Sequence, residues 1–538
     1  MKYDLIIRNG TVYDGLGGEP FVADVALMGE TIAEVGPNLA ATADSEIDAA
    51  GMAVSPGFIN MLSWAGEPLL HDGRSQSDIR QGVTLEVMGE AFSFGPITDE
   101  MANQEGGVMG RNFDYSYDIP WRTLREYLDH LTVLGVSCNV ASYVGTHTLR
   151  INAMGFDARP PTADELEHMK QMVRQAMAEG AVGMSAALVY PPAGFAKTDE
   201  LIELCKVVAE YDGVYVSHLR SEGDSFLEAL EEFLTILREA KVRGEIYHLK
   251  AAGHNNWHKM DEAFKMIEAA RAEGLTVTAD MYLYPAGGTG LRFIVPLWAH
   301  DGGVEALLKR LKDPATREKI KEEMVKPSAD WENFWAAAES PAGIFIAQCN
   351  DPNLRHLNGK SIQEIADARG VEPIDAALDL VIQDNGNTSA IYFMMSEENI
   401  EKQIKQPWVS FDSDGGSIAP EPPFINSMPH PRTYGNFARL LGKYVREREV
   451  ISLQEAVRKL TNFPASVLGF KGRGQLKAGY QADVVIFDPD TVADHATFTE
   501  PHQYSTGVRD VLVNGVAVLR DGEHTNARPG QVVVPKRS

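Results

Sequence analysis

Four side chains that can bind a metal ion or move a proton stand at the ends of apolar, strand-like segments. His218 closes VYVSH and His248 closes EIYH, Glu90 follows TLEVM, and Asp414 lies in FDSDGG. Imidazole nitrogens bind zinc-like ions well, and two histidines with one carboxylate form a familiar catalytic set. We interpret these four residues as candidates for one metal-dependent site.

Each candidate also has a simpler interpretation. A lone histidine at a strand end is more often a hydrogen-bonded rim residue, and Asp-Gly is common in turns. Two such histidines on successive strands, followed two residues later by Arg220 and Lys250, favour a site. Glu86 shares a strand face with Glu90. Because a buried carboxylate is costly unless it is paired, we expect an internal cation beside Glu86.

The segments that position these residues alternate between strand-like and helix-like patterns, as in the βα units of a parallel barrel. In such barrels the catalytic groups lie at the carboxyl ends of the strands. TADELEHMKQMVRQAMAEG predicts a helix with Thr162 and Asp164 as cap candidates and Gly180 as its stop. We expect the barrel to span 56–472, with a charged, helical insertion near 291–345.

Both ends of the chain are rich in short strands. Residues 1–55 and 473–538 share this style, which predicts one small β-sandwich built from both termini. Asn9-Gly10 and Asp14-Gly15 are turn dipeptides between apolar runs.

Composition narrows the class of protein. The 538 residues carry a formal charge of −27, which argues against a nucleic-acid partner but allows a small anionic substrate held by local cations. We find no signal peptide and no long apolar run, so no membrane span is expected. Cys138, Cys205 and Cys349 show no paired spacing, which favours a reduced cytoplasm. The sequence leaves the oligomeric state open.

The chain resembles the N-acyl-D-amino-acid deacylases (D-aminoacylases) of the amidohydrolase superfamily along essentially its whole length. The motifs that carry the resemblance include IIRNGTVYDG, SHLRSEGD, YHLKAAG, ADMYLYPAGGT, PHPRTYGNFARLLG and GQLKAGYQADVVIFDP. The resemblance implies a TIM-like (β/α)8 barrel with a small β-sandwich. It also implies a small carboxylate-bearing substrate and metal-dependent cleavage of the amide bond of an N-acyl amino acid of D configuration.

The resemblance also implies roles for single residues. His218 and His248 match metal ligands, and Asp414 matches the general acid/base of the family. Lys250, Tyr282 and Arg432 match the residues that hold the substrate carboxylate. A guanidinium and an ammonium that converge on one carboxylate make physical sense.

The departures from the family lie on the metal site. In PGFINMLSWA, Leu62 and Trp64 stand where the family writes two metal-binding histidines. The family's cysteine ligand is also replaced, by Ala91 in strict alignment, so Glu90 is our candidate for the missing ligand. We therefore expect about one zinc ion per chain, and we expect Leu62 and Trp64 to form an apolar wall that favours an apolar or aromatic group of the ligand.

Three functions remain open on the sequence. The first is a single-metal hydrolase of N-acyl amino acids. The second is a related enzyme with another substrate or reaction, such as a cyclic imide, a carbamoyl compound or a non-hydrolytic step. The third is a ligand-binding protein without catalysis.

Overall fold

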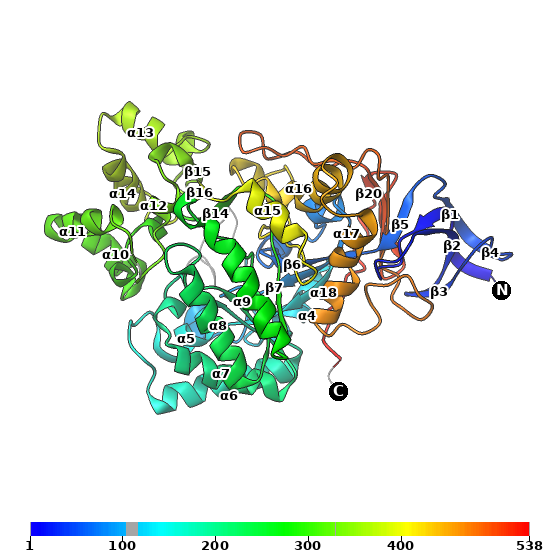
Figure 1. Ribbon diagram of the computed structural model, residues 1–538, viewed down its shortest axis with the longest axis horizontal. Helices are drawn as coiled ribbons and strands as arrows, with labels where there is room; N and C mark the ends of the chain where they lie inside the picture. The colour runs from blue at the N-terminus through cyan, green and yellow to red at the C-terminus, as the bar shows by residue number, and fades with distance from the viewer. Residues whose placement is uncertain (1, 104–116, 329, 537–538) are drawn as a thin grey trace.

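The computed structural model describes residues 2–103, 117–328 and 330–536, which form a barrel, a β-sandwich and a helical lobe. Figure 1 shows the sandwich at one end, where blue and red strands from the two ends of the chain meet, and the lobe at the other. The barrel lies between them. Among the described residues, no helix is long and apolar enough to cross a membrane.

Eight strand segments close the barrel. Seven of them belong to two parallel sheets, β6-β7-β8 and β9-β10-β11-β12-β13, where β8 and β9 together count as one segment. The short β9 continues β8 after one residue, and the last segment, 409–415, pairs with β13 through Ala279–Val409 and with β6 through Ser63–Gly415. The strands are β6 (Phe58–Ser63), β7 (Val83–Met88), β8 (Asn139–Ser142), β9 (Val144–Gly145), β10 (Gly183–Ala187), β11 (Val214–His218), β12 (Arg243–Ile246) and β13 (Val277–Ala279). The predicted barrel is confirmed, and its closure brings the chain near residue 60 beside the chain near residue 414.

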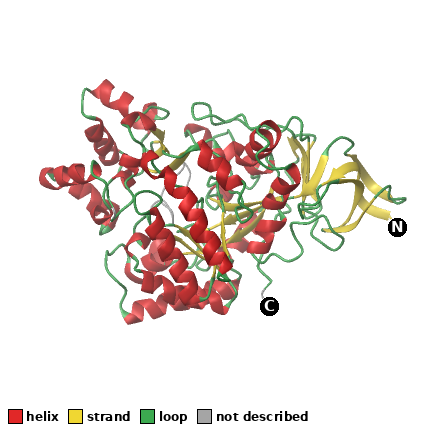
Figure 2. Cartoon of the chain, viewed as in Figure 1, coloured by secondary structure: helices red, strands yellow, loops and turns green. Residues whose placement is uncertain are grey.

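Helices surround the barrel (Figure 2). The longest, α6, begins with a capping box between Thr162 and Glu165 and ends at Gly180, whose φ of 109° only glycine adopts readily. The predicted start and stop are therefore confirmed. The barrel helices are α4 (Leu124–Leu134), α5 (Thr146–Met154), α6 (Ala163–Glu179), α7 (Thr198–Glu210), α8 (Phe226–Ala240), α9 (Met260–Ala272), α15 (Glu397–Ile404), α16 (Arg432–Arg439), α17 (Leu453–Leu460) and α18 (Asn462–Val467), with the short α1 (Pro68–His71), α2 (Gln76–Ile79) and α3 (Asp99–Asn103).

The sandwich is built from both ends of the chain, as predicted. Strand β5 pairs with β1 on one side and with β17 on the other. Its strands are β1 (Lys2–Val12), β2 (Phe21–Met28), β3 (Thr31–Gly36), β4 (Thr42–Asp48), β5 (Ala53–Pro56), β17 (Val484–Phe487), β18 (Val508–Val513), β19 (Val516–Arg520) and β20 (Glu523–His524).

The expected turn at Asn9-Gly10 is wrong, because β1 runs through it. The register against β2 shifts between Ile7 and Gly10, and Asn9 has a φ of 61°. A Cβ on Gly10 would lie 2.3 Å from a methyl of Val54. Asn-Gly suits a β-bulge for the same reason that it suits a turn, since both need left-handed backbone.

The lobe extends further than the helical segment predicted near 291–345. It has its own hydrophobic core and a small antiparallel sheet, ordered β14-β16-β15. Its elements are β14 (Ala286–Gly290), α10 (Gly303–Lys312), α11 (Pro314–Met324), α12 (Phe334–Ala337), β15 (Ile344–Gln348), α13 (Ile362–Arg369), α14 (Pro373–Gln383) and β16 (Ser389–Phe393).

Candidate active site

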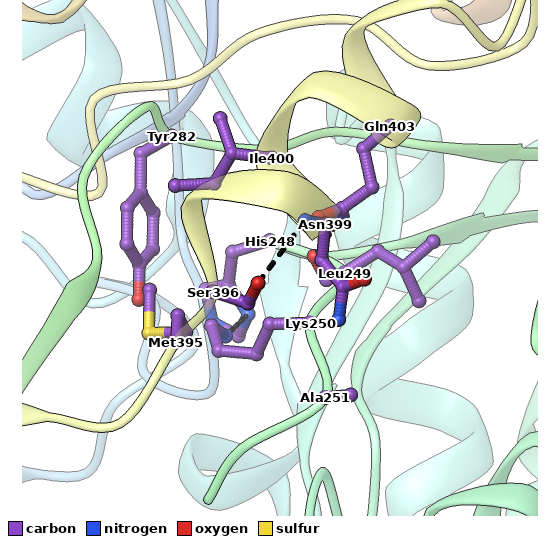
Figure 3. A pocket seen from close by; sticks show the side chains of 10 residues that line it. All are labelled: His248, Leu249, Lys250, Ala251, Tyr282, Met395, Ser396, Asn399, Ile400 and Gln403. Carbon is purple, nitrogen blue, oxygen red and sulfur yellow. Dashed lines mark hydrogen bonds between the residues drawn. The ribbon is translucent and has the colours of Figure 1, made fainter. Parts of the chain in front are cut away.

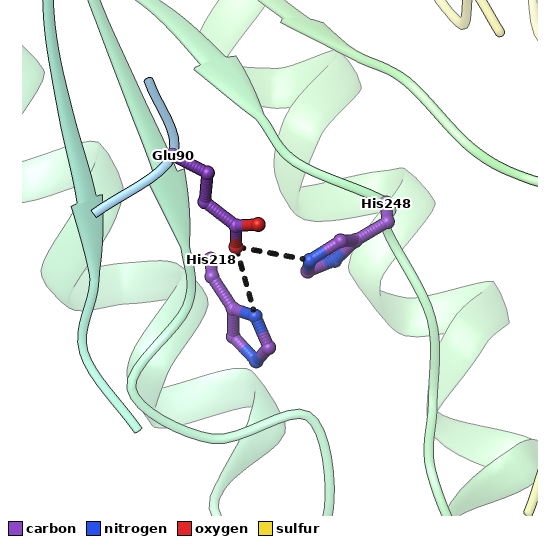
Figure 4. Close-up of side chains that lie close together, drawn as sticks. All are labelled: Glu90, His218 and His248. Atoms are coloured by element: carbon purple, nitrogen blue, oxygen red, sulfur yellow. Dashed lines mark ion pairs between the residues drawn. The ribbon is translucent and has the colours of Figure 1, made fainter. Parts of the chain in front are cut away.

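Glu90, His218 and His248 converge at the carboxyl end of the barrel (Figure 4). His218 is the last residue of β11, whereas Glu90 follows β7 and His248 follows β12. Glu90 Oε1 lies 3.5 Å from His218 Nδ1 and 3.4 Å from His248 Nε2. His248 has a φ of 33°, a costly backbone for a side chain of this size. All three side chains are buried.

This spacing fits a divalent metal ion. Bonds of about 2.0–2.1 Å in a tetrahedral site place neighbouring ligand atoms about 3.3–3.4 Å apart. Glu90 Oε1 is buried and receives no hydrogen bond from the described residues. Such an orphaned oxygen between two imidazoles is the pattern expected of a ligand set.

The charges at this cluster support one another. Burial opposes ionisation of Glu90, but the imidazole rings of His218 and His248, 3.4–3.5 Å away, outweigh it and hold the pKa of Glu90 well below the usual range. Burial lowers the pKa of His218. Burial and the Lys250 ammonium lower the pKa of His248, whereas Glu222 and Glu90 raise it to about 9. Glu90 is therefore an anion, ready to share a cation with the two rings.

Glu222, which the sequence analysis missed, lies behind the two histidines. Its carboxylate is 3.5 Å from His218 Nε2, 3.2 Å from His248 Nδ1 and 2.6 Å from Lys250 Nζ. Carboxylates in this position orient metal-binding imidazoles and raise their basicity. The sequence SHLRSEGD contains Glu222 four residues after His218. Because Glu222 does not stand at the end of a strand-like segment, the strand patterns did not mark it as a site residue.

Lys250, which was predicted to hold the substrate carboxylate, already contacts two side chains of the site. Besides Glu222, its Nζ lies 2.7 Å from His248 Nδ1 (Figure 3). Burial lowers the pKa of Lys250, but Glu222 outweighs this and raises it, so the ammonium stays charged.

Tyr282 separates Lys250 from Arg432. The ring centroid is 5.4 Å from Lys250 Nζ and 4.3 Å from Arg432 Cζ. Burial raises the pKa of Tyr282 to about 12, so the phenol stays protonated. Arg432 Nη2 pairs with Asp414 Oδ2 at 2.9 Å, while its buried Nε and Nη1 have no hydrogen-bond partner among the described residues. Those two nitrogens are free to hold an anionic ligand.

Trp64 and Asp414 are joined by a hydrogen bond, in which the indole Nε1 donates to Asp414 Oδ1 at 2.9 Å. Asp414 has a φ of 40° and lies at the end of the last barrel segment, 409–415. Its backbone N–H donates to Leu62 O, and the N–H of Trp64 donates to Gly415 O, each at 3.0 Å. Barrel closure therefore fixes the two residues side by side.

The expected wall of Leu62 and Trp64 is wrong in one half. Leu62 is 0% exposed and packs in the barrel interior with Leu85, Val87 and Tyr247, whereas Trp64 lines the cavity. Residues two apart on a strand share one face, but Trp64 lies beyond the end of β6, and the register of β6 against β7 shifts after Asn60. Leu62 and Trp64 therefore do not share a face. Leu62 is a core residue, and only Trp64 contributes to the site.

Two other expectations also need correction. Glu86 forms no ion pair among the described residues; Ser63 Oγ donates to it at 2.7 Å, and burial raises its pKa, which favours the neutral acid. Arg220 pairs with Glu232 at 2.7 Å and donates to the carbonyls of Gly194 and Ala196, outside the cavity. Arg220 is therefore structural.

One cavity of about 930 Å³ contains all eight residues predicted for the site. They are Trp64, Glu90, His218, His248, Lys250, Tyr282, Asp414 and Arg432. Residues of the lobe, among them Arg292 and Asn387, also line this cavity. A space of this size accepts a small molecule of tens of atoms. A second void, of about 10 Å³, is lined by Lys250 and has about the volume that one water molecule needs (Figure 3).

Comparisons with known proteins show the family of this chain. The amidohydrolase family model matches residues 45–519. The D-aminoacylase of Alcaligenes xylosoxydans xylosoxydans is 32% identical over 99% of this chain and 97% of its own length. The chain belongs to the D-aminoacylase family of amidohydrolases.

Solved structures of family members share the fold over the whole chain. The N-acyl-D-glutamate deacylase of Bordetella bronchiseptica, in complex with zinc and a phosphonate mimic of the tetrahedral intermediate, is 31% identical, with a TM-score of 0.83 over 99% of this chain and 100% of that one. A D-aminoacylase described as having a binuclear metal centre with one-metal activation and second-metal attenuation is 33% identical, with a TM-score of 0.80 over 99% of this chain and 100% of that one.

Proposed function

We propose that this chain is a single-metal hydrolase that cleaves the amide bond of an N-acyl-D-amino acid. The observation that carries the proposal is the convergence of a three-ligand set and a cationic clamp on one cavity. The D configuration and the acylated amino acid come from the relatives, which act on such compounds by name.

Glu90, His218 and His248 would hold one zinc-type ion. When bound, such an ion polarises the scissile carbonyl and makes a water molecule more acidic at neutral pH. Leu62 offers no ligand atom, and the indole of Trp64 only donates. These two residues therefore support one ion rather than two.

The remaining residues bind substrate and move the proton. Arg432, through Nε and Nη1, holds the substrate carboxylate, with Lys250 and the neutral Tyr282 beside it. Asp414 accepts the proton of the attacking water and passes it to the leaving amine. Each carboxylate oxygen of Asp414 has a second lone pair beyond the one used by Trp64 or Arg432, so it can still act as a base.

Activity against a panel of substrates tests the proposal. We expect hydrolysis of N-acyl-D-amino acids, slower hydrolysis of their L isomers, and little hydrolysis of carboxamides in which the α-carboxylate is masked. Elemental analysis should give about one zinc per chain, removed by chelation together with activity. Cleavage of cyclic imides or carbamoyl compounds alone would favour altered chemistry instead, and a protein without metal and without activity would favour ligand binding.

The compartment is part of the same proposal. All three cysteines are buried and unpaired. Free thiols fit the reducing cytoplasm inferred from the sequence.

A further inference from the structure

The side chain of Trp64 contacts the one group in the cavity that must accept a proton in the proposed function. Of the two donors to Asp414 among the described residues, Arg432 is charged and has two buried nitrogens without a partner. The indole N–H of Trp64 is neutral and comes from across the barrel seam. Together they occupy one lone pair on each carboxylate oxygen.

We propose that Trp64 is a positioning residue, which holds the carboxylate of Asp414 in the orientation that proton transfer requires. The inference rests on the proposed function, because it gives Trp64 a role in that reaction. It differs from an apolar wall, since the group that matters is the indole N–H rather than the ring surface.

The backbone around the pair supports this role. The mutual hydrogen bonds of Asp414 to Leu62 O and of Trp64 to Gly415 O fix both main chains across the closing seam. Leu62 is fully buried beneath them and anchors β6 in the core. Asp414 keeps a left-handed φ, which needs surrounding contacts to persist. The hydrogen bond therefore joins two rigid positions and is not a chance surface contact.

Chemistry explains why an indole suits this position. A carboxylate held by one donor rotates about its last bond, whereas a donor on each oxygen fixes its plane. An indole N–H donates, cannot accept and does not titrate, so it cannot compete with Asp414 for the proton of the water. Arg432 alone cannot provide this control, because it also has to follow the substrate carboxylate.

The test removes the N–H and keeps the ring. Site-specific replacement of Trp64 by β-(3-benzothienyl)alanine exchanges only N–H for sulfur, and Trp64→Phe is the genetic counterpart. We expect kcat to fall roughly 10–100-fold, a part of the roughly 100–10,000-fold that general acid–base catalysis contributes, because Asp414 keeps its carboxylate but loses its fixed orientation. KM should stay within about 3-fold. Zinc content and the thermal midpoint should stay close to those of the wild type.

A matched control is present in the lobe. Trp298 is also partly exposed, and its Nε1 donates to Glu323 Oε2 at 2.8 Å, but it lies outside the cavity. Trp298→Phe should leave kcat and KM unchanged. The indole proton resonance that disappears in Trp64→Phe should lie downfield in the wild type and move upfield in Asp414→Ala, which reports the bond without using activity.

The outcomes separate the two proposals. A wild type that hydrolyses no N-acyl amino acid contradicts the proposed function. An active wild type whose kcat survives loss of the N–H contradicts the positioning role, and a change confined to KM or to acyl-group preference would make Trp64 a substrate wall instead.

Discussion

A single carboxylate, Glu90, completes the proposed ligand set. Because its Oε1 is 3.4–3.5 Å from both ring nitrogens, Glu90→Gln replaces an anionic ligand by a neutral amide. We expect zinc affinity to fall by more than about 100-fold, since even changes behind the ligands commonly cost 10–100-fold. Metal titration of the apoprotein measures this directly.

The matched variant is Glu86→Gln, four residues earlier on β7. Burial raises the pKa of Glu86, and its carboxylate lies outside the cluster of Glu90, His218 and His248. Zinc binding should be retained. Equal zinc affinity in both variants would remove Glu90 from the ligand set.

Arg432 is the group that distinguishes acid from amide substrates. Arg432→Met removes the two unpartnered nitrogens, and we expect KM for N-acyl amino acids to rise, with a cost on the order of 2–5 kcal/mol. Carboxamide analogues should be almost unaffected in KM. Arg432→Lys should recover little, because an ammonium cannot hold Asp414 and the substrate at separate edges. An acid preference that survives both substitutions would place the clamp elsewhere.

Much of this site could be predicted at the level of residues. All eight residues predicted for the site are among those that line the cavity, because ligand and clamp types recur at fixed positions after strands. The pairing of Lys250 with Glu222, and of Trp64 with Asp414, could not be predicted. Those contacts depend on side-chain rotamers and on how residues far apart in sequence meet at the barrel seam.

At the level of elements, β6 both packs in the barrel core and places Trp64 at the cavity, and a strand pattern alone does not distinguish these two roles. Its Leu62 packs inside the barrel, and the next outward position, Trp64, lies past the strand end. Leu62→Ala should therefore lower the free energy of unfolding by about 2–5 kcal/mol. Relative kcat/KM values for aromatic and small acyl groups should not change in the folded protein. A shift in that ratio without loss of stability would return Leu62 to the cavity.

The lobe contacts the barrel at a titratable residue, Glu332. Its Oε2 accepts from Ser221 Oγ at 2.8 Å and from the N–H of Glu222 at 3.0 Å, so the lobe fixes the loop that carries Glu222. Burial, followed by the charge of Glu222, raises the pKa of Glu332 to about 7. The folded state thus keeps a proton that the unfolded state loses near pH 4.5.

The stability that depends on this proton is present below about pH 4.5 and is lost as pH rises to about 7. Over that window, Glu332 should lower the free energy of unfolding by up to about 3 kcal/mol relative to Glu332→Gln. Denaturant unfolding of both proteins at several pH values measures the difference. A difference that does not vary with pH would show that Glu332 is ionised throughout.

At the scale of the molecule, the C-terminal tail joins the sandwich to the barrel. Gly530 donates to Val136 O at 2.8 Å, and a Cβ at this position would lie 2.0 Å from Cys138 O. Gly530→Ala should push the tail from β8 and cost on the order of 1–3 kcal/mol, the range for overpacking. Gly18→Ala, with nothing within 4 Å of its Cβ, is the control. Equal thermal midpoints would mean that the tail adapts freely.

The overall architecture was the most predictable level. Alternating strands and helices indicated a barrel, and the matching style of both termini indicated one sandwich. The lobe was underestimated, because its small sheet is formed by β14, β15 and β16, which lie far apart in sequence, and none shows a barrel-like βα pattern.

The pairing of β5 with β17 sets an order of assembly on the ribosome. Strands β1 to β5 emerge first, but the strand that covers the edge of β5 is made only after the whole barrel. During synthesis the nascent chain therefore carries an uncovered strand edge, which is the kind of surface that recruits neighbouring chains or chaperones. Strands β1 to β4 find partners among themselves and on β5 within the first 56 residues, so the wait for a partner falls on one edge of β5 alone.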